Sequence, residues 1–188
     1  GAFMTTKTQG TRIIYLLLTR SETYFSRLIH HVTDGEYTHA SLGLEGPRGP
    51  FYSFARKNPR MALPAGLIQE HADRGFFSLH PHIPCCLYEL EVSEDTYRFL
   101  CRRLEVMYRN RERYHYSLLG TLACFFRLPF ARRHHKFCSE FVAEMLCESG
   151  AVELGKDPCL TRPMDFCSLS DLRPIHQGEV GGLMGSVA

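Results

Sequence analysis

Residues 136–146 carry the pattern that most constrains how this chain can fold. Apolar side chains at positions 137, 141, 142, 145 and 146 follow the 3.6-residue period of a helix that buries one face. Cys138 stands where that helix is expected to begin, so backbone N–H groups and the positive end of the helix dipole surround its sulfur. These surroundings favour the thiolate over the thiol, so the helix can present a nucleophile while it packs on another element.

A nucleophilic thiol needs a general base, and residues 38–44 offer a histidine on a short strand-like run. Each residue alone has an ordinary interpretation. A cysteine in an apolar helix usually serves packing, and a single histidine is usually an ordinary strand residue. Taken together, Cys138 and His39 favour a catalytic pair, because both stand at the ends of predicted elements.

The remaining hydrophobic patterns predict short strands and helices in a non-alternating order, which is typical of an α+β domain. The predicted strands cover residues 12–18, 37–45, 51–56 and 87–92. The predicted helices cover residues 23–32, 94–110 after an N-cap at Ser93, 117–125, and 138 to about 149. Segment 57–84 is rich in Pro and Gly, and we expect irregular structure there with one strand at 75–79.

Length and composition fit one ordinary domain over residues 1–188, with flexible tails expected at 1–11 and 177–188. The net charge of +2 is too small to imply nucleic acid or an anionic membrane as partner. The apolar run 13–18 is far too short for stable membrane insertion. The basic cluster 127–136 is either a solvated loop or a positive potential that favours the thiolate and attracts anionic substrates.

The cysteine usage favours a reducing compartment. The eight cysteines show neither CxxC spacing nor the Cys/His spacing of a zinc site, and a chain of this length does not need disulfides. We therefore expect no metal and no cofactor. The first residues lack the pattern of a secretory signal, so we expect a cytoplasmic protein.

Five segments together form a familiar pattern: 25–29 (FSRLI), 37–41 (YTHAS), 52–57 (YSFARK), 137–142 (FCSEFV) and 161–166 (TRPMDF). They resemble bacterial permuted papain-like amidases, the circularly permuted relatives of the NlpC/P60 cysteine peptidases. The resemblance covers residues 12–172 and includes the inverted order of histidine before cysteine, whereas papain and ordinary NlpC/P60 proteins have cysteine first. It implies a small antiparallel sheet or barrel packed against helices.

The resemblance implies Cys138 as nucleophile and His39 as general base. A tyrosine hydroxyl often joins such a site for oxyanion or substrate binding, and Tyr114 and Tyr116 are the candidates, although both fit simple packing as well. The family also places a polar residue near the histidine to orient it. Glu45 is six residues farther along the same strand, roughly 20 Å away, too far to orient the ring.

The strand that follows the turn is better placed, and its register decides which residue lies beside His39. If Leu44 pairs with Pro50, Ser53 shares the face of the imidazole as a diagonal neighbour. If the register shifts by one residue, Arg56 faces His39, and an arginine cannot accept the imidazole N–H. Ser53 is therefore the predicted orienting residue, with a backbone carbonyl or water as the alternative.

Three functions stay open at this point. The first is a cysteine hydrolase that cleaves an amide or peptide bond of a small peptide or acylated small molecule through a thioester. The second is thiol-dependent acyl transfer or lipid deacylation, as in lecithin:retinol acyltransferase-like proteins. The third is a binding module for peptides or amino acids in which the pair is idle. The substrate, the oligomeric state and a lid role for segment 57–84 do not follow from the sequence.

Overall fold

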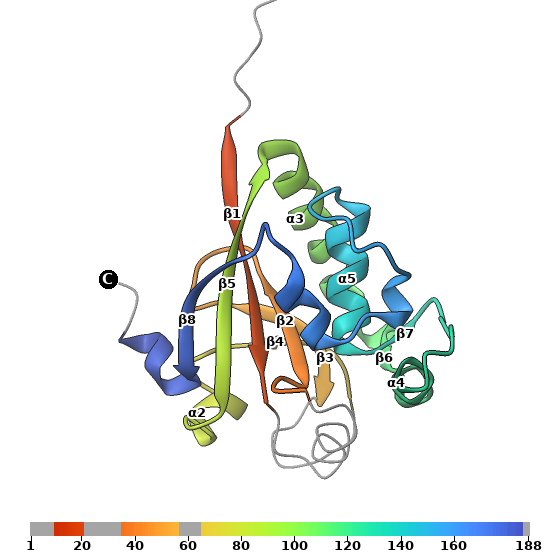
Figure 1. Cartoon of the computed structure of the whole chain (residues 1–188), viewed down its shortest axis with the longest axis horizontal. Helices are drawn as coiled ribbons and strands as arrows, with labels where there is room; N and C mark the ends of the chain where they lie inside the picture. Colours follow the sequence, from red (N-terminus) through yellow and green to blue (C-terminus); the bar gives the residue numbers. More distant parts are fainter. Residues whose placement is uncertain (1–9, 21–34, 57–64, 186–188) are drawn as a thin grey trace, which may run out of the picture.

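A six-stranded antiparallel sheet organises the fold (Figure 1). The computed structural model describes residues 10–20, 35–56 and 65–185. The order of strands across the sheet is β4-β3-β2-β1-β5-β8, and a second, two-stranded parallel sheet pairs β6 with β7. The strands are β1 (Thr11–Thr19), β2 (His39–Gly43), β3 (Phe51–Arg56), β4 (Ala65–Glu70), β5 (Pro84–Ser93), β6 (His115–Tyr116), β7 (His135–Lys136) and β8 (Arg173–Glu179).

Helices α3 and α5 lie on the same side of this sheet, and α5 packs directly on β2 and β3 (Figure 1). The α-helices are α2 (Phe76–Leu79), α3 (Glu94–Arg109), α4 (Leu118–Phe125) and α5 (Cys138–Glu148). The 3₁₀ turns are η1 (Arg111–Arg113), η2 (Pro158–Leu160), η3 (Pro163–Ser168) and η4 (Val180–Met184).

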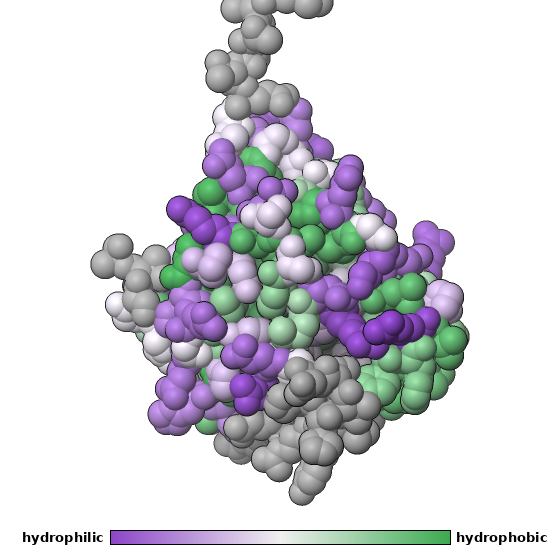
Figure 2. All heavy atoms as spheres, viewed as in Figure 1, coloured by the Kyte–Doolittle hydropathy of each residue, from purple (hydrophilic) through white to green (hydrophobic). Residues whose placement is uncertain are grey.

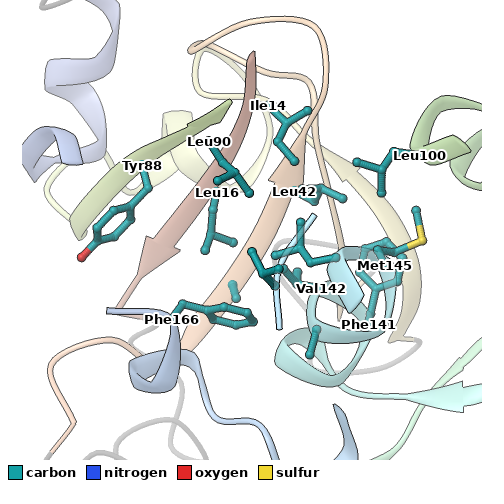
Figure 3. Packing of buried hydrophobic residues seen from close by; sticks show 14 of the residues in the cluster. Ile14, Leu16, Leu42, Tyr88, Leu90, Leu100, Phe141, Val142, Met145 and Phe166 are labelled. Carbon is teal, nitrogen blue, oxygen red and sulfur yellow. The ribbon is translucent and has the colours of Figure 1, made fainter. Parts of the chain in front are cut away.

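The alternation of side chains along β1 divides the core into two clusters, because successive residues of a strand point to opposite faces. Leu16 and Leu18 belong to the cluster that packs against α5, whereas Leu17 belongs to a second cluster on the other face. Figure 3 shows the first cluster, in which Phe141, Val142 and Met145 of α5 meet side chains from β1 and β2. The second cluster contains Phe51, Phe77, Leu87, Val180 and Leu183.

The mixed α+β class is as predicted, and seven elements lie where the periodicity places them: β1, β2, β3, β5, α3, α4 and α5. The Ser93 hydroxyl accepts the Thr96 N–H at 3.1 Å, which is the expected N-cap of α3. The helix predicted at 23–32 lies outside the described residues.

Two predictions about the fold are wrong. Segment 75–79 forms the short helix α2 rather than a strand, and the preceding strand β4 was not predicted, because its alanine and glycine give little strand signal. Residues 177–185 are not a flexible tail. They complete β8 on the edge of the sheet and continue into η4, where Val180 and Leu183 are fully buried. Pro174 and Gly178 conceal this strand in the sequence, although an edge strand tolerates both.

Candidate active site

Cys138 is the first residue of α5, and the local sequence explains why the helix begins there. Phe137 is the N-cap in extended conformation, and its N–H donates to the Glu140 carboxylate at 3.3 Å, as in a capping box. The sulfur of Cys138 accepts backbone N–H groups from Ser139, in the first turn, and from Ala40, on β2. These N–H groups stabilise a negative charge on the sulfur.

His39 opens β2 and lies between a carboxylate and the sulfur. Its Nε2 is 2.7 Å from Oε1 of Glu70, the last residue of β4, and the two side chains are only 14% and 7% exposed. The imidazole also forms a hydrogen bond with Cys138. Since Nε2 faces the carboxylate, Nδ1 is the nitrogen left for the sulfur. The fold thus assembles the chain Glu70–His39–Cys138.

The surroundings of His39 and Cys138 favour a positively charged imidazolium and a negatively charged thiolate. Burial alone lowers the pKa of His39, but the Glu70 carboxylate and Cys138 outweigh burial and raise that pKa to about 10. Burial alone raises the pKa of the Cys138 thiol, and the hydrogen bond and charge of His39 outweigh it, so that pKa is lowered. Both shifts favour the charged pair, a thiolate beside an imidazolium.

Ser53 does not orient His39, which corrects the sequence prediction. The register is the first of the two considered, since Leu42 faces Tyr52 and Gly43 faces Phe51. However, the Ser53 hydroxyl donates to the Ala40 carbonyl at 2.6 Å, so it satisfies the backbone rather than the imidazole.

The orienting residue that sequence reasoning missed is Glu70. Phe51 pairs with Glu70 and Ser53 with Ile68, which puts the Glu70 side chain on the same face of the sheet as Ser53. The available signal was an acid two residues after the apolar pair Leu67–Ile68, in a segment predicted to be irregular. Because Oε2 of Glu70 is buried without a hydrogen-bond partner among the described residues, the carboxylate has His39 as its main partner.

Of the two candidate tyrosines, the structure brings Tyr116 to the site. Burial raises the pKa of Tyr116, the Cys138 charge raises it further, and Thr121, whose hydroxyl is 3.2 Å away, partly opposes them. The phenol therefore stays protonated near the sulfur and can donate a hydrogen bond. Tyr114 instead packs edge-on against the rings of Phe54 and His134, with centroids 6.1 and 5.5 Å away.

In the described part of the chain, no three His, Cys, Asp or Glu side chains gather into a possible metal site. All eight cysteines are free thiols. Within the same residues, no helix has the length and apolar character needed to cross a membrane. No protein-family model, no curated protein and no solved structure matches the chain.

Proposed function

We propose that the protein is a cysteine hydrolase of the permuted papain-like type, which cleaves an amide or peptide bond through a thioester. The observation that carries this proposal is the buried chain Glu70–His39–Cys138, in which the thiol pKa is lowered and the imidazole pKa raised. The order of histidine before cysteine and the packing of the cysteine helix on the histidine strand support the same type.

In this mechanism the Cys138 thiolate attacks the carbonyl carbon of the substrate, and the electron pair of the C=O bond moves to oxygen. The first N–H groups of α5 and the Tyr116 hydroxyl stabilise this oxyanion. The His39 imidazolium then gives its proton to the leaving amine, and the C–N bond breaks to leave a thioester.

Hydrolysis of the thioester reverses the roles. The now neutral imidazole of His39 takes a proton from water, the hydroxide attacks the thioester carbon, and the acid leaves as the Cys138 thiolate reforms. Glu70 stabilises the imidazolium at both stages and fixes the ring so that one nitrogen faces the sulfur. The steps balance without a metal or redox partner.

The test is the pH dependence of iodoacetamide alkylation at each cysteine, read by mass spectrometry. Wild-type Cys138 should react well below about pH 8.5, the pKa of a free thiol. His39→Ala should move its profile up toward that value. Cys167, which is exposed, provides the internal reference in both proteins. Cys138→Ser should abolish turnover of amide substrates at an almost unchanged melting temperature.

Equal reactivity of Cys138 and Cys167 at every pH would contradict the proposal and favour the binding module. A profile that is low in wild type and unchanged in His39→Ala would remove His39 from the mechanism.

A further inference from the structure

Helix α4 turns an apolar face to solvent. Leu118, Leu122 and Phe126 lie four residues apart and so share one face, and Leu119 is beside them. Six of the ten exposed large hydrophobic side chains in the described residues fall between positions 118 and 130, so they gather rather than scatter. We name this the α4 patch: Leu118, Leu119, Leu122, Phe126, Leu128 and Phe130.

Figure 2 shows hydrophobic side chains gathered over α4 at the lower right of the molecule, with hydrophilic ones beside them. Phe126 is 68% exposed and Leu119 60%, which is high for side chains of this kind. An isolated exposed leucine is ordinary, but a group of this size on one helix and the segment after it marks an interaction surface.

The inner side of α4 is fixed to the start of α5, so the apolar face cannot turn inward. Gly120 is buried, and a Cβ atom there would lie 3.3 Å from Cδ1 of Phe137. The N-cap Ser117 donates its backbone N–H to the Lys136 carbonyl at 2.8 Å. The helix can therefore meet a partner only with its outer face.

The charged side chains of the segment that forms the patch have one sign. From Arg113 to Ser139 the sequence contains no Asp or Glu, while Arg127, Arg132 and Arg133 are exposed around the apolar side chains. The pKa of His135 is lowered by burial and then by the positive charges of Arg132, His115 and His134, which reflects the same local potential. The net charge of +2 for the whole chain hides this concentration.

The end of α4 holds one of these arginines in an unfavourable backbone conformation. Leu128 donates its N–H to the Ala123 carbonyl at 2.8 Å, which is the longer bond of a Schellman motif. Arg127 occupies the left-handed position of that motif, with φ of 57°, where glycine is the usual residue. An arginine at this position keeps a cation at the rim of the apolar face despite the strain.

From this combination we infer that the α4 patch docks on a membrane surface that contains anionic lipids. The leucines and phenylalanines would enter the boundary between headgroups and acyl chains, and the three arginines would contact lipid phosphates. An apolar face whose own segment carries only cations is the pattern of an interfacial helix. A protein partner matched to this surface would need an apolar groove beside acidic side chains.

This docking is peripheral and differs from stable insertion, and it rests on a local concentration of charge that the net charge does not imply. It does not depend on the proposed chemistry, so it can be measured on the inactive variant. It places the membrane next to the candidate site, because only Ser117 separates Tyr116 from α4, and Gly120 of α4 packs near Phe137, the residue before Cys138.

The experiment is co-sedimentation of the full chain carrying Cys138→Ser with vesicles of phosphatidylcholine containing about a third phosphatidylserine. We expect binding to these vesicles, little binding to pure phosphatidylcholine, and loss of binding as salt rises. Leu119→Gln/Phe126→Gln should abolish sedimentation. Arg132→Gln and Arg133→Gln should each weaken binding about fivefold, as expected for one cation at an anionic surface.

The matched controls lie around α2, across the molecule from α4 (Figure 1). Leu79→Gln removes a side chain that is 54% exposed, and Arg74→Gln removes an exposed arginine, so neither should change vesicle binding. Failure of the parent to bind anionic vesicles, or equal losses in controls and patch variants, would overturn the inference. Self-association that Leu119→Gln/Phe126→Gln abolishes, without vesicle binding, would show instead that the patch is a dimer interface.

Discussion

At the scale of single residues, the partner of His39 is a carboxylate, Glu70, rather than a serine hydroxyl. A carboxylate stabilises the charged imidazolium much more strongly than a hydroxyl does. In Glu70→Gln the hydrogen bond to His39 can persist while the negative charge is lost. We therefore expect the pKa of His39 to fall, the pKa of Cys138 to rise, and turnover to drop by about 10²–10⁴-fold. Alkylation of Cys138 as a function of pH measures the shift directly.

Ser53→Ala is the matched control for Glu70→Gln, since both residues are buried on the same face of the sheet. Loss of the Ser53 hydrogen bond to the Ala40 carbonyl should cost about 1 kcal/mol of stability. The pH profile of Cys138 should stay unchanged. Equal shifts of that profile in the two variants would give Ser53 the orienting role predicted from the sequence.

Glu140, two residues after Cys138, makes the stability of the fold depend on pH. Burial raises its pKa to about 7, although Lys136 and the Phe137 N–H partly oppose this, and Glu144 and Asp157 raise it slightly further. The folded chain thus binds this proton more tightly than the unfolded chain, whose pKa is about 4.3. The contribution of Glu140 to stability is therefore most favourable below about pH 4.3, decreases up to about pH 7 and stays low above it.

Glu140→Gln keeps an acceptor for the Phe137 N–H but carries no charge to bury. Its melting temperature should exceed that of wild type at pH 8 and approach it near pH 4.5, in thermal unfolding followed by circular dichroism. A less stable variant at pH 8 would mean that the carboxylate is needed in its charged form by the buried Lys136.

At the scale of elements, the end of α4 combines a stability cost with a surface charge. Because glycine adopts a positive φ without strain, Arg127→Gly should raise the stability of the protein by about 1 kcal/mol. Arg132→Gly, which removes a charge from the same loop without a positive φ to relieve, should not stabilise. Urea unfolding of the two variants compares them, and equal stabilities would argue against strain at Arg127.

How far the elements could be predicted depended on whether their signal was local. The helical period and the cap at Ser93 predicted α3, and the apolar run in β1 predicted a buried strand. β4 and β8 carry no such signal, because Gly66, Pro174 and Gly178 disfavour a strand when considered alone. These strands form by pairing with strands far away in the sequence, and no short stretch of sequence predicts such pairing.

The same difference between local and long-range signals explains which residues of the candidate site could be predicted. Cys138 and His39 could be predicted because each stands at the end of a locally encoded element. Glu70 could not, since its position beside His39 depends on two strand registers in succession, β2 with β3 and β3 with β4. The register of β2 with β3 was among those considered, yet Ser53 was the wrong partner for His39. The Ser53 hydroxyl donates its hydrogen bond to the Ala40 carbonyl instead.

At the scale of the whole molecule, the site exists only when parts far apart in the sequence pack together. Cys138 lies close to Thr38, 100 residues earlier, with its sulfur 4.0 Å from the Thr38 carbonyl oxygen. Helix α5 both carries Cys138 and supplies core side chains to the sheet, so packing at one end of the helix fixes the position of the other (Figure 3).

Leu146→Ala tests whether a loss of core packing at the far end of α5 changes the pKa of Cys138 at its start. Leu146 is buried in the core more than two turns from Cys138, and its truncation should destabilise the protein by about 2–5 kcal/mol. Where the variant remains folded, the alkylation profile of Cys138 should match that of wild type, because the first turn keeps its own contacts with Ala40 and His39. A profile that returns toward the free thiol value in folded molecules would show that the lowered pKa depends on the whole core rather than on these neighbours.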